Sequence, residues 1–301
     1  MPRLSILCSL LDTDASPALM LGRELHRSRL DLKAHRWDPS LETLSGLLDA
    51  AADPACALWC VAGTRRALED GPTRRALSLA ALGVQALRGR DFPIMILPLG
   101  GRPPLLPEAL ADAELADRGA AGKILARLHR PTALPARPWR LRPHCPQGLG
   151  LWLEVGPVST VWRGALCGVC GHDALGAAIR PLAHAVGPAG AVPAQSMLES
   201  PLEELSLPTE RGIFLAKGAG NELGPDTSYY VQLSAMPAEL LLGPLPRAGQ
   251  CELTALRLEQ GSSPAPAEPS APAAARKAVL PRQTTYRHVR QGAPARGSQR
   301  S

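Results

Sequence analysis

The chain has 301 residues and a mass of 31.8 kDa, enough for two domains of ordinary size. Aromatic residues make up 3% of it, too few for the stacking platforms of a single-strand nucleic-acid binder. Its 31 prolines and 28 glycines follow no three-residue period, which excludes a collagen-like structure, and no apolar run approaches the length of a membrane span. The composition therefore predicts a globular protein and leaves its activity open.

The excess positive charge lies at the C-terminal end. From Gly261 onward there are seven basic residues against one acid, which equals the net charge of +6 of the whole chain. Residues 1–260 are therefore neutral overall, and we expect no duplex-wide basic face on the folded part. The segment 261–301 is rich in Pro, Ala and Ser and is predicted to be a disordered basic tail, through which any nucleic-acid contact would have to pass.

Seven cysteines without a secretion signal indicate reduced thiols and a cytoplasmic protein. The apolar run at residues 4–11 is followed by Asp12 and Asp14, where a signal peptide would need small residues. We expect this run to be a buried strand, and we expect no membrane contact.

Residues 1–130 alternate between strands and helices. Apolar runs predict strands at 4–10, 56–62 and 92–99, and an alternating segment predicts another at 30–37. Periodic segments that follow capping residues predict helices at 18–27, 40–52 and 72–87, with one or two more within 107–129. This order is typical of a parallel sheet covered by helices on both faces, so we predict an α/β domain over 1–130.

The pattern changes after residue 130. The segment 131–143 holds four prolines and three arginines and is predicted to be a linker. Beyond it, helical periodicity is sparse and Gly-Pro turns separate short strand-like runs. We therefore predict a small β-rich domain over 144–260, with strands at 149–155, 158–169, 213–217, 228–233 and 252–258.

Three features of the first hundred residues resemble a known family. The strand SILCSL leads into an Asp-rich turn, Arg36-Trp37-Asp38-Pro39 precedes a helix, and the third and fourth strands end in a small-residue turn and a proline. In these features the segment, about a third of the chain, is similar to the bacterial Toll/interleukin-1 receptor (TIR) domains. The resemblance implies a flavodoxin-like sheet with strand order 2-1-3-4-5.

The resemblance also implies what the protein does. TIR domains self-associate, and their enzymatic members hydrolyse NAD with a glutamate on the helix after the third strand. Ala76 stands at about that position here, and no acid lies between Asp70 and Asp91. A methyl group cannot stabilise the positive charge that develops on the sugar. We therefore predict a non-catalytic interaction or signalling protein of bacterial type, in a defence or stress response, with no cofactor.

An enzymatic alternative stays open, with Glu69 as a displaced catalytic carboxylate of an NAD or nucleoside glycohydrolase. Ligands of open α/β sheets bind beyond the carboxyl ends of the strands, where Glu69 is expected. Ser9, Asp12, Arg36 and Asp38 are expected to line the same crevice. Each of these residues is equally explained as a helix cap or an exposed turn residue.

A second candidate site is a cysteine cluster. Cys167 and Cys170 have the C-x-x-C spacing of zinc or redox sites, and Cys145 and His172 could complete a set of four zinc ligands. With the basic tail, this cluster gives a third hypothesis, a zinc-supported nucleic-acid-associated factor. The alternative is that these are small side chains in a strand and turn. Cys56 and Cys60 are expected in the core, on one side of their strand.

Overall fold

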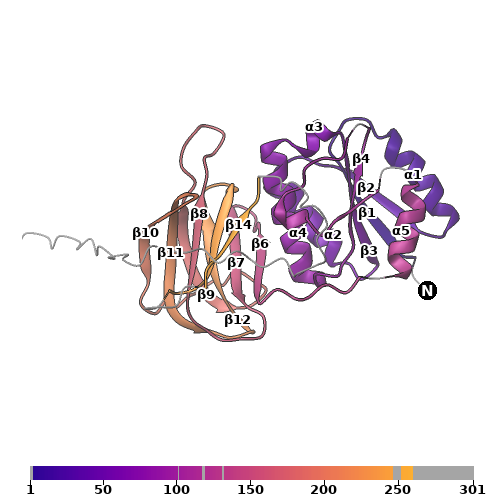
Figure 1. The fold of residues 1–301 in the computed structure, drawn as a ribbon. Helices are drawn as coiled ribbons and strands as arrows, with labels where there is room; N and C mark the ends of the chain where they lie inside the picture. The colour runs from indigo at the N-terminus through magenta and orange to yellow at the C-terminus, as the bar shows by residue number, and fades with distance from the viewer. Residues whose placement is uncertain (1–2, 101, 117–118, 131, 247–251, 260–301) are drawn as a thin grey trace, which may run out of the picture.

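The structure is a computed structural model that describes residues 3–100, 102–116, 119–130, 132–246 and 252–259. An α/β half, formed by the N-terminal part of the chain, lies beside a half built of antiparallel sheets (Figure 1). The predicted basic tail at 261–301 lies outside the described residues.

The α/β half is built on a five-stranded parallel sheet, as the sequence predicts. Its strand order is β2-β1-β3-β4-β5. The short strand β5 pairs in parallel with β4; the resemblance implies a fifth strand, but this segment was predicted to be helical. The strands are β1 (Ser5–Leu10), β2 (Asp31–Arg36), β3 (Cys56–Gly63), β4 (Ile94–Pro98) and β5 (Glu114–Leu115).

Helices cover both faces of this sheet. α1 and α5 pack on one face, and α2 and α4 pack on the other. The helices are α1 (Ser16–Arg27), α2 (Leu41–Ala52), α3 (Arg65–Leu68), α4 (Gly71–Arg88), the 3-10 helix η1 (Glu108–Leu110) and α5 (Ala120–His129). Among the described residues, no helix is both long enough and apolar enough to cross a lipid bilayer.

Side chains cap two of the helices that form as predicted. The Ser40 hydroxyl accepts a hydrogen bond from the Thr43 amide at the start of α2, and the Asp70 carboxylate accepts one from the Thr73 amide at the start of α4. Helix α1 begins without such a side-chain cap. Ala15 occupies the N-cap position without a side-chain bond.

A bulge in β3 separates the two cysteines expected on one side of it. The pairing register with β1 shifts, so that Ser5 faces Cys56 and Ile6 faces Leu58. Cys56 therefore packs with the α2 and α4 face, whereas Cys60 packs with the α1 and α5 face. Both are core residues, but the prediction that they share a face is wrong.

The second half is β-rich, as predicted, and consists of two antiparallel sheets. One has the order β6-β7-β12-β9 and the other β10-β11-β8-β13-β14. The predicted linker ends earlier than expected, because its last residues belong to β6. The strands are β6 (Trp139–His144), β7 (Leu151–Pro157), β8 (Trp162–Cys170), β9 (Pro181–Pro188), β10 (Leu202–Thr209), β11 (Gly212–Leu223), β12 (Thr227–Leu233), β13 (Glu239–Pro244) and β14 (Thr254–Arg257).

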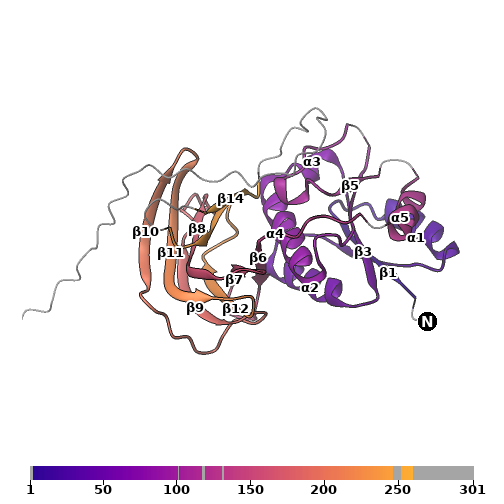
Figure 2. The same cartoon turned by 60° about the horizontal axis from the view of Figure 1, so that its bottom comes forward.

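Helix α4 belongs to the core of both halves. It packs against α2 on one side and against β6 on the other, and both figures show β6 beside it (Figure 2). The two antiparallel sheets form a β-sandwich, and β6 and β14 are edge strands of these sheets. Helix α4 therefore covers the side of the sandwich on which β6 and β14 lie. One hydrophobic cluster runs without a break from Leu44 of α2 through Leu79 of α4 to Leu153 and Leu242 of the sandwich.

Candidate functional site

Asp12 lies beyond the carboxyl end of β1 and ties two loops together. Its carboxylate accepts hydrogen bonds from the backbone amide of Thr64, at 2.6 Å, and from the Thr64 hydroxyl, at 3.1 Å. Thr64 in turn caps the short helix α3. Asp12 therefore joins the turn after β1 to the turn after β3. This is the edge at which a crevice-lining residue is expected, but both carboxylate oxygens already accept hydrogen bonds from Thr64.

Arg36 is the last residue of β2, and Asp38 follows that strand at the same edge. Arg36 is exposed, and none of the described residues forms an ion pair or a hydrogen bond with its side chain. Asp38 accepts hydrogen bonds from the Ser40 amide at 3.0 Å and from the Thr43 hydroxyl at 3.1 Å. These bonds, chiefly those from Ser40, lower the pKa of Asp38. The carboxylate of Asp38 therefore orders the start of α2.

Glu69 stands at the end of α3 and holds a loop. Its carboxylate is 2.9 Å from Arg65 Nε and accepts a 3.3 Å hydrogen bond from the Leu105 amide. Desolvation alone would raise the pKa of Glu69, but the Leu105 and Arg65 bonds lower it overall. The carboxylate of Glu69 is therefore engaged with Arg65 and with the loop at Leu105.

Ala76, the residue that the TIR resemblance places at about the position of the catalytic glutamate, is fully buried. It lies on α4, within the cluster shared by the sheet and the sandwich. A carboxylate placed there would be removed from water and would face an apolar core. The neighbouring acid Asp70 is engaged in capping α4 through Thr73.

Ser9 does not line the crevice, contrary to expectation, because it is fully buried. Its hydroxyl accepts a 3.0 Å hydrogen bond from Trp59 Nε1 and lies 3.1 Å from His35 Nε2. Burial lowers the pKa of His35. The sequence analysis missed this cluster. The register that pairs Ser9 with His35 across β1 and β2 creates it, and no sequence signal fixes that register.

The predicted metal ligands do not come together. Cys167 faces the space between the two antiparallel sheets, whereas Cys170, three residues further along β8, packs into a separate cluster on the other face. Burial raises the pKa of Cys167 to about 12 and that of Cys145 to about 11, which disfavours the thiolate that binds metals. Within the described ranges, no group of three or more His, Cys, Asp or Glu side chains could hold a metal ion.

The β-sandwich contains a buried carboxylate that the sequence analysis missed. Glu154 on β7 is fully buried and lies 3.0 Å from Arg140 Nε and 2.8 Å from His144 Nε2. It also accepts hydrogen bonds from the Ser228 hydroxyl and the Gly190 amide. Burial alone would raise the pKa of Glu154, but the bonds from His144 and Ser228 lower it overall. A lone acid within the apolar run LGLWLEV was the available signal.

A second polar chain joins the two antiparallel sheets on the side away from α4. The Tyr229 hydroxyl is 2.8 Å from His184 Nδ1, and His184 Nε2 is 2.7 Å from Glu203, which also pairs with Lys217. Because a carboxylate only accepts, Nε2 carries the proton and Nδ1 accepts from the tyrosine. Burial, with help from the charge of Lys217, lowers the pKa of His184 to about 4.

No protein-family model matches this chain, and no curated protein matches it. Among solved structures, one similar chain is a lipoprotein fragment from Peptoclostridium difficile 630, with 11% identity. The alignment covers 42% of this chain and 100% of that fragment, and its TM-score is 0.28. A likeness at that level says nothing about the role of this protein, so the function rests on the residues described above.

Proposed function

We propose that this protein is a non-catalytic, TIR-like interaction component of bacterial type, acting in a defence or stress response through self-association of its α/β half. The strand order β2-β1-β3-β4-β5 agrees with the order that the TIR resemblance implies. Arg36 and Asp38 lie at the end of β2, as the second conserved segment of that family would require.

The observation that carries the proposal is the burial of Ala76. In the enzymatic family members the corresponding helix carries a catalytic carboxylate, whereas here it packs between a sheet and a sandwich. The acids that remain near the carboxyl edge are engaged: Asp12 with Thr64, Asp38 with Ser40, and Glu69 with Arg65. This arrangement favours a scaffold over a glycohydrolase.

The surface of α1 supports the proposed self-association. Leu19 and Met20 are adjacent on this helix, and each keeps 64% of its surface exposed. Paired exposed apolar side chains on a helix are costly in water and are stabilised by a partner surface. We therefore place the contact between copies on α1.

Two measurements test the proposal. The full chain, incubated with excess NAD, should release no more nicotinamide than buffer does. Turnover that disappears in Glu69→Gln but persists in the exposed control Glu24→Gln would establish the glycohydrolase alternative instead.

For the association, sedimentation velocity over a range of concentrations should show a concentration-dependent dimer or larger species. The Leu19→Ser/Met20→Ser double variant should shift the distribution to the monomer. Leu175→Ser, at an apolar residue that is 94% exposed in the sandwich half, should not. A chain that is monomeric throughout, or one that Leu175→Ser dissociates equally well, would contradict self-association through α1.

A further inference from the structure

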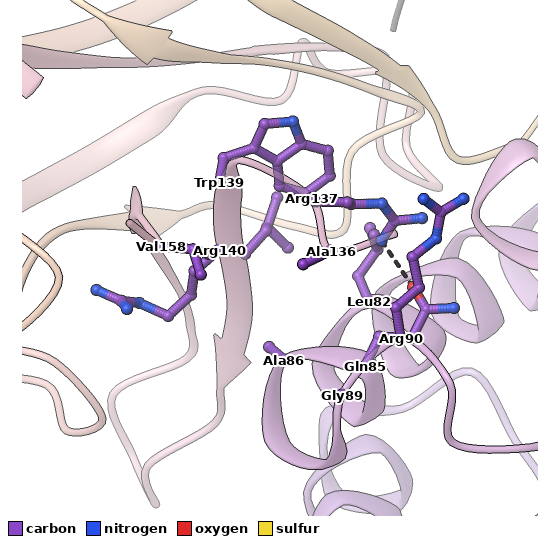
Figure 3. A pocket seen from close by; sticks show the side chains of 11 residues that line it. Leu82, Gln85, Ala86, Gly89, Arg90, Ala136, Arg137, Trp139, Arg140 and Val158 are labelled. Carbon is purple, nitrogen blue, oxygen red and sulfur yellow. Dashed lines mark hydrogen bonds between the residues drawn. The ribbon is translucent and has the colours of Figure 1, made fainter. Parts of the chain in front are cut away.

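A pocket lies where α4 meets the start of the β-sandwich. Its volume is about 240 Å³, and Figure 3 shows it between the last turns of α4 and the segment that enters β6. Leu82 and Ala86 line it from α4, and Arg137, Trp139 and Val158 line it from the segment that enters β6 and from the end of β7. Ligand sites are often found at such junctions between packed units.

Arg137 carries a positive charge that the surrounding protein does not neutralise directly. Its Nη1 donates a 2.7 Å hydrogen bond to the neutral side-chain oxygen of Gln85, and its guanidinium lies 5.0 Å from the centre of the Trp139 ring. Figure 3 shows its side chain reaching across to Gln85. In the described part of the chain, no carboxylate comes within ion-pair distance of Arg137, and a guanidinium has four further N–H groups to donate.

The other two arginines of the pocket are already paired. Arg90 donates from Nε and Nη2 to Asp112, at 3.1 and 2.7 Å, and from Nη1 to the Pro135 carbonyl. Arg140 pairs with the buried Glu154 and donates to the Ser228 hydroxyl. In Figure 3 the Arg140 side chain points away from Arg137. The cation available to a ligand is therefore that of Arg137.

The pKa of Arg137 agrees with an uncompensated charge. Desolvation, together with repulsion from Arg90, lowers this pKa to about 10, although Asp112 and Glu108 oppose the shift from beyond ion-pair distance. The C-terminal end of α4 also offers only a partial negative charge. An anionic ligand in the pocket would therefore interact with Arg137 more favourably than any group that now lies beside it.

We propose that this pocket binds a small organic anion, with its carboxylate or phosphate on the Arg137 guanidinium and its apolar body against Trp139, Leu82 and Val158. A planar guanidinium matches two oxygens of either anion. The volume admits a small molecule rather than a cofactor of dinucleotide size. This inference does not depend on the proposed self-association, because α1 lies on the other face of the parallel sheet from α4.

Calorimetric titration of the full chain at constant ionic strength tests the proposal. The probes are benzoate, phenyl phosphate and inorganic phosphate, with benzamide as the neutral match for benzoate. We expect saturable binding of benzoate or phenyl phosphate and none of benzamide. Benzoate alone would identify a carboxylate ligand, and phenyl phosphate alone a phosphate ester. Inorganic phosphate should bind more weakly than phenyl phosphate because it lacks an apolar body.

Three variants locate the site. Arg137→Gln keeps a polar side chain but removes the charge, and should weaken binding of the anion by about tenfold or more. Ala86→Phe, at an exposed position in the lining, should block the pocket without changing the charge. Arg23→Gln, on α1, removes the same charge elsewhere and should bind like the native chain. The proposal is overturned if no probe saturates below about 10 mM, if benzamide binds as well as benzoate, or if Arg137→Gln binds like the native chain.

Discussion

The Ser78 hydroxyl donates a 2.7 Å hydrogen bond to the backbone carbonyl of Leu258. Ser78 lies on α4, and Leu258 follows β14, the edge strand of one antiparallel sheet. Both residues are fully buried, so the bond joins the α/β half to the end of the sandwich inside their shared core. The two halves are thus connected by buried polar contact as well as by apolar packing.

Removing this hydroxyl should destabilise the whole protein. Ser78→Ala leaves the Leu258 carbonyl buried without its partner, which costs about 1–3 kcal/mol. Ser45→Ala, at a half-buried helical serine on α2, provides the baseline for the gain in helix propensity. Urea unfolding of the two variants should give a lower free energy of unfolding for Ser78→Ala alone. Equal values for both variants would show that the bond contributes nothing.

The close approach of α4 to its neighbours should make Gly83 intolerant of a side chain. A Cβ at Gly83 would lie 2.7 Å from Leu48 Cδ2 and 3.0 Å from Pro143 Cδ, and the proline ring cannot move aside easily. Gly83→Ala should therefore lower the free energy of unfolding by about 1–3 kcal/mol. Gly46→Ala on α2 meets no atom within 4 Å and should raise it by about 0.5–1 kcal/mol. Chemical denaturation should therefore show that the two glycine-to-alanine substitutions change the free energy of unfolding in opposite directions.

The architecture of the α/β half could be predicted because most of its strands and helices have their own local signal. The run CALWCVA and the capped segment after Ser40 both formed as expected. The position of β5 was not predicted, because a strand of two residues shows no periodicity. β6 was not predicted because the four prolines of 131–143 suggested a linker, although Trp139 and Leu141 alternate with polar residues and an edge strand tolerates a proline such as Pro143.

The polar clusters could not be predicted, because they depend on register and on long-range pairing. Ser9 meets His35 only because β1 and β2 pair as they do, and Asp12 meets Thr64 across 52 positions of sequence. The spacing of Cys167 and Cys170 suggested a metal site, but a strand points residues three apart to opposite faces. The spacing of two residues in one segment predicts that their side chains converge only when the local backbone conformation is known.

Neutralising Glu154 should lower the stability of the protein, because Arg140 loses its carboxylate partner. Glu154→Gln leaves Arg140 without its carboxylate, and we expect a loss of about 3 kcal/mol at pH 7. Because the folded-state pKa of Glu154 is lowered, the stability it supplies is present above its ordinary pKa of 4.5 and is lost as the pH falls through the lower folded value. The difference between native and variant should therefore shrink in denaturation series below about pH 4.5. Glu24→Gln, on the surface of α1, should follow the native curve, and a difference independent of pH would contradict the assignment.

His184 should make the protein sensitive to mild acid in a separate pH window. Its folded pKa of about 4 lies below the ordinary value of 6.5, so the unfolded chain takes up a proton first as the pH falls. The stability that the neutral ring supplies is complete above pH 6.5 and declines towards pH 4, by about 1–2 kcal/mol between pH 7 and pH 5. His184→Gln can still hydrogen-bond but cannot titrate, so its free energy of unfolding should fall less over that range. His129→Gln, at an exposed position on α5, should keep the native slope. If the slope is the same in all three chains, the link between Tyr229 and Glu203 does not depend on a neutral His184.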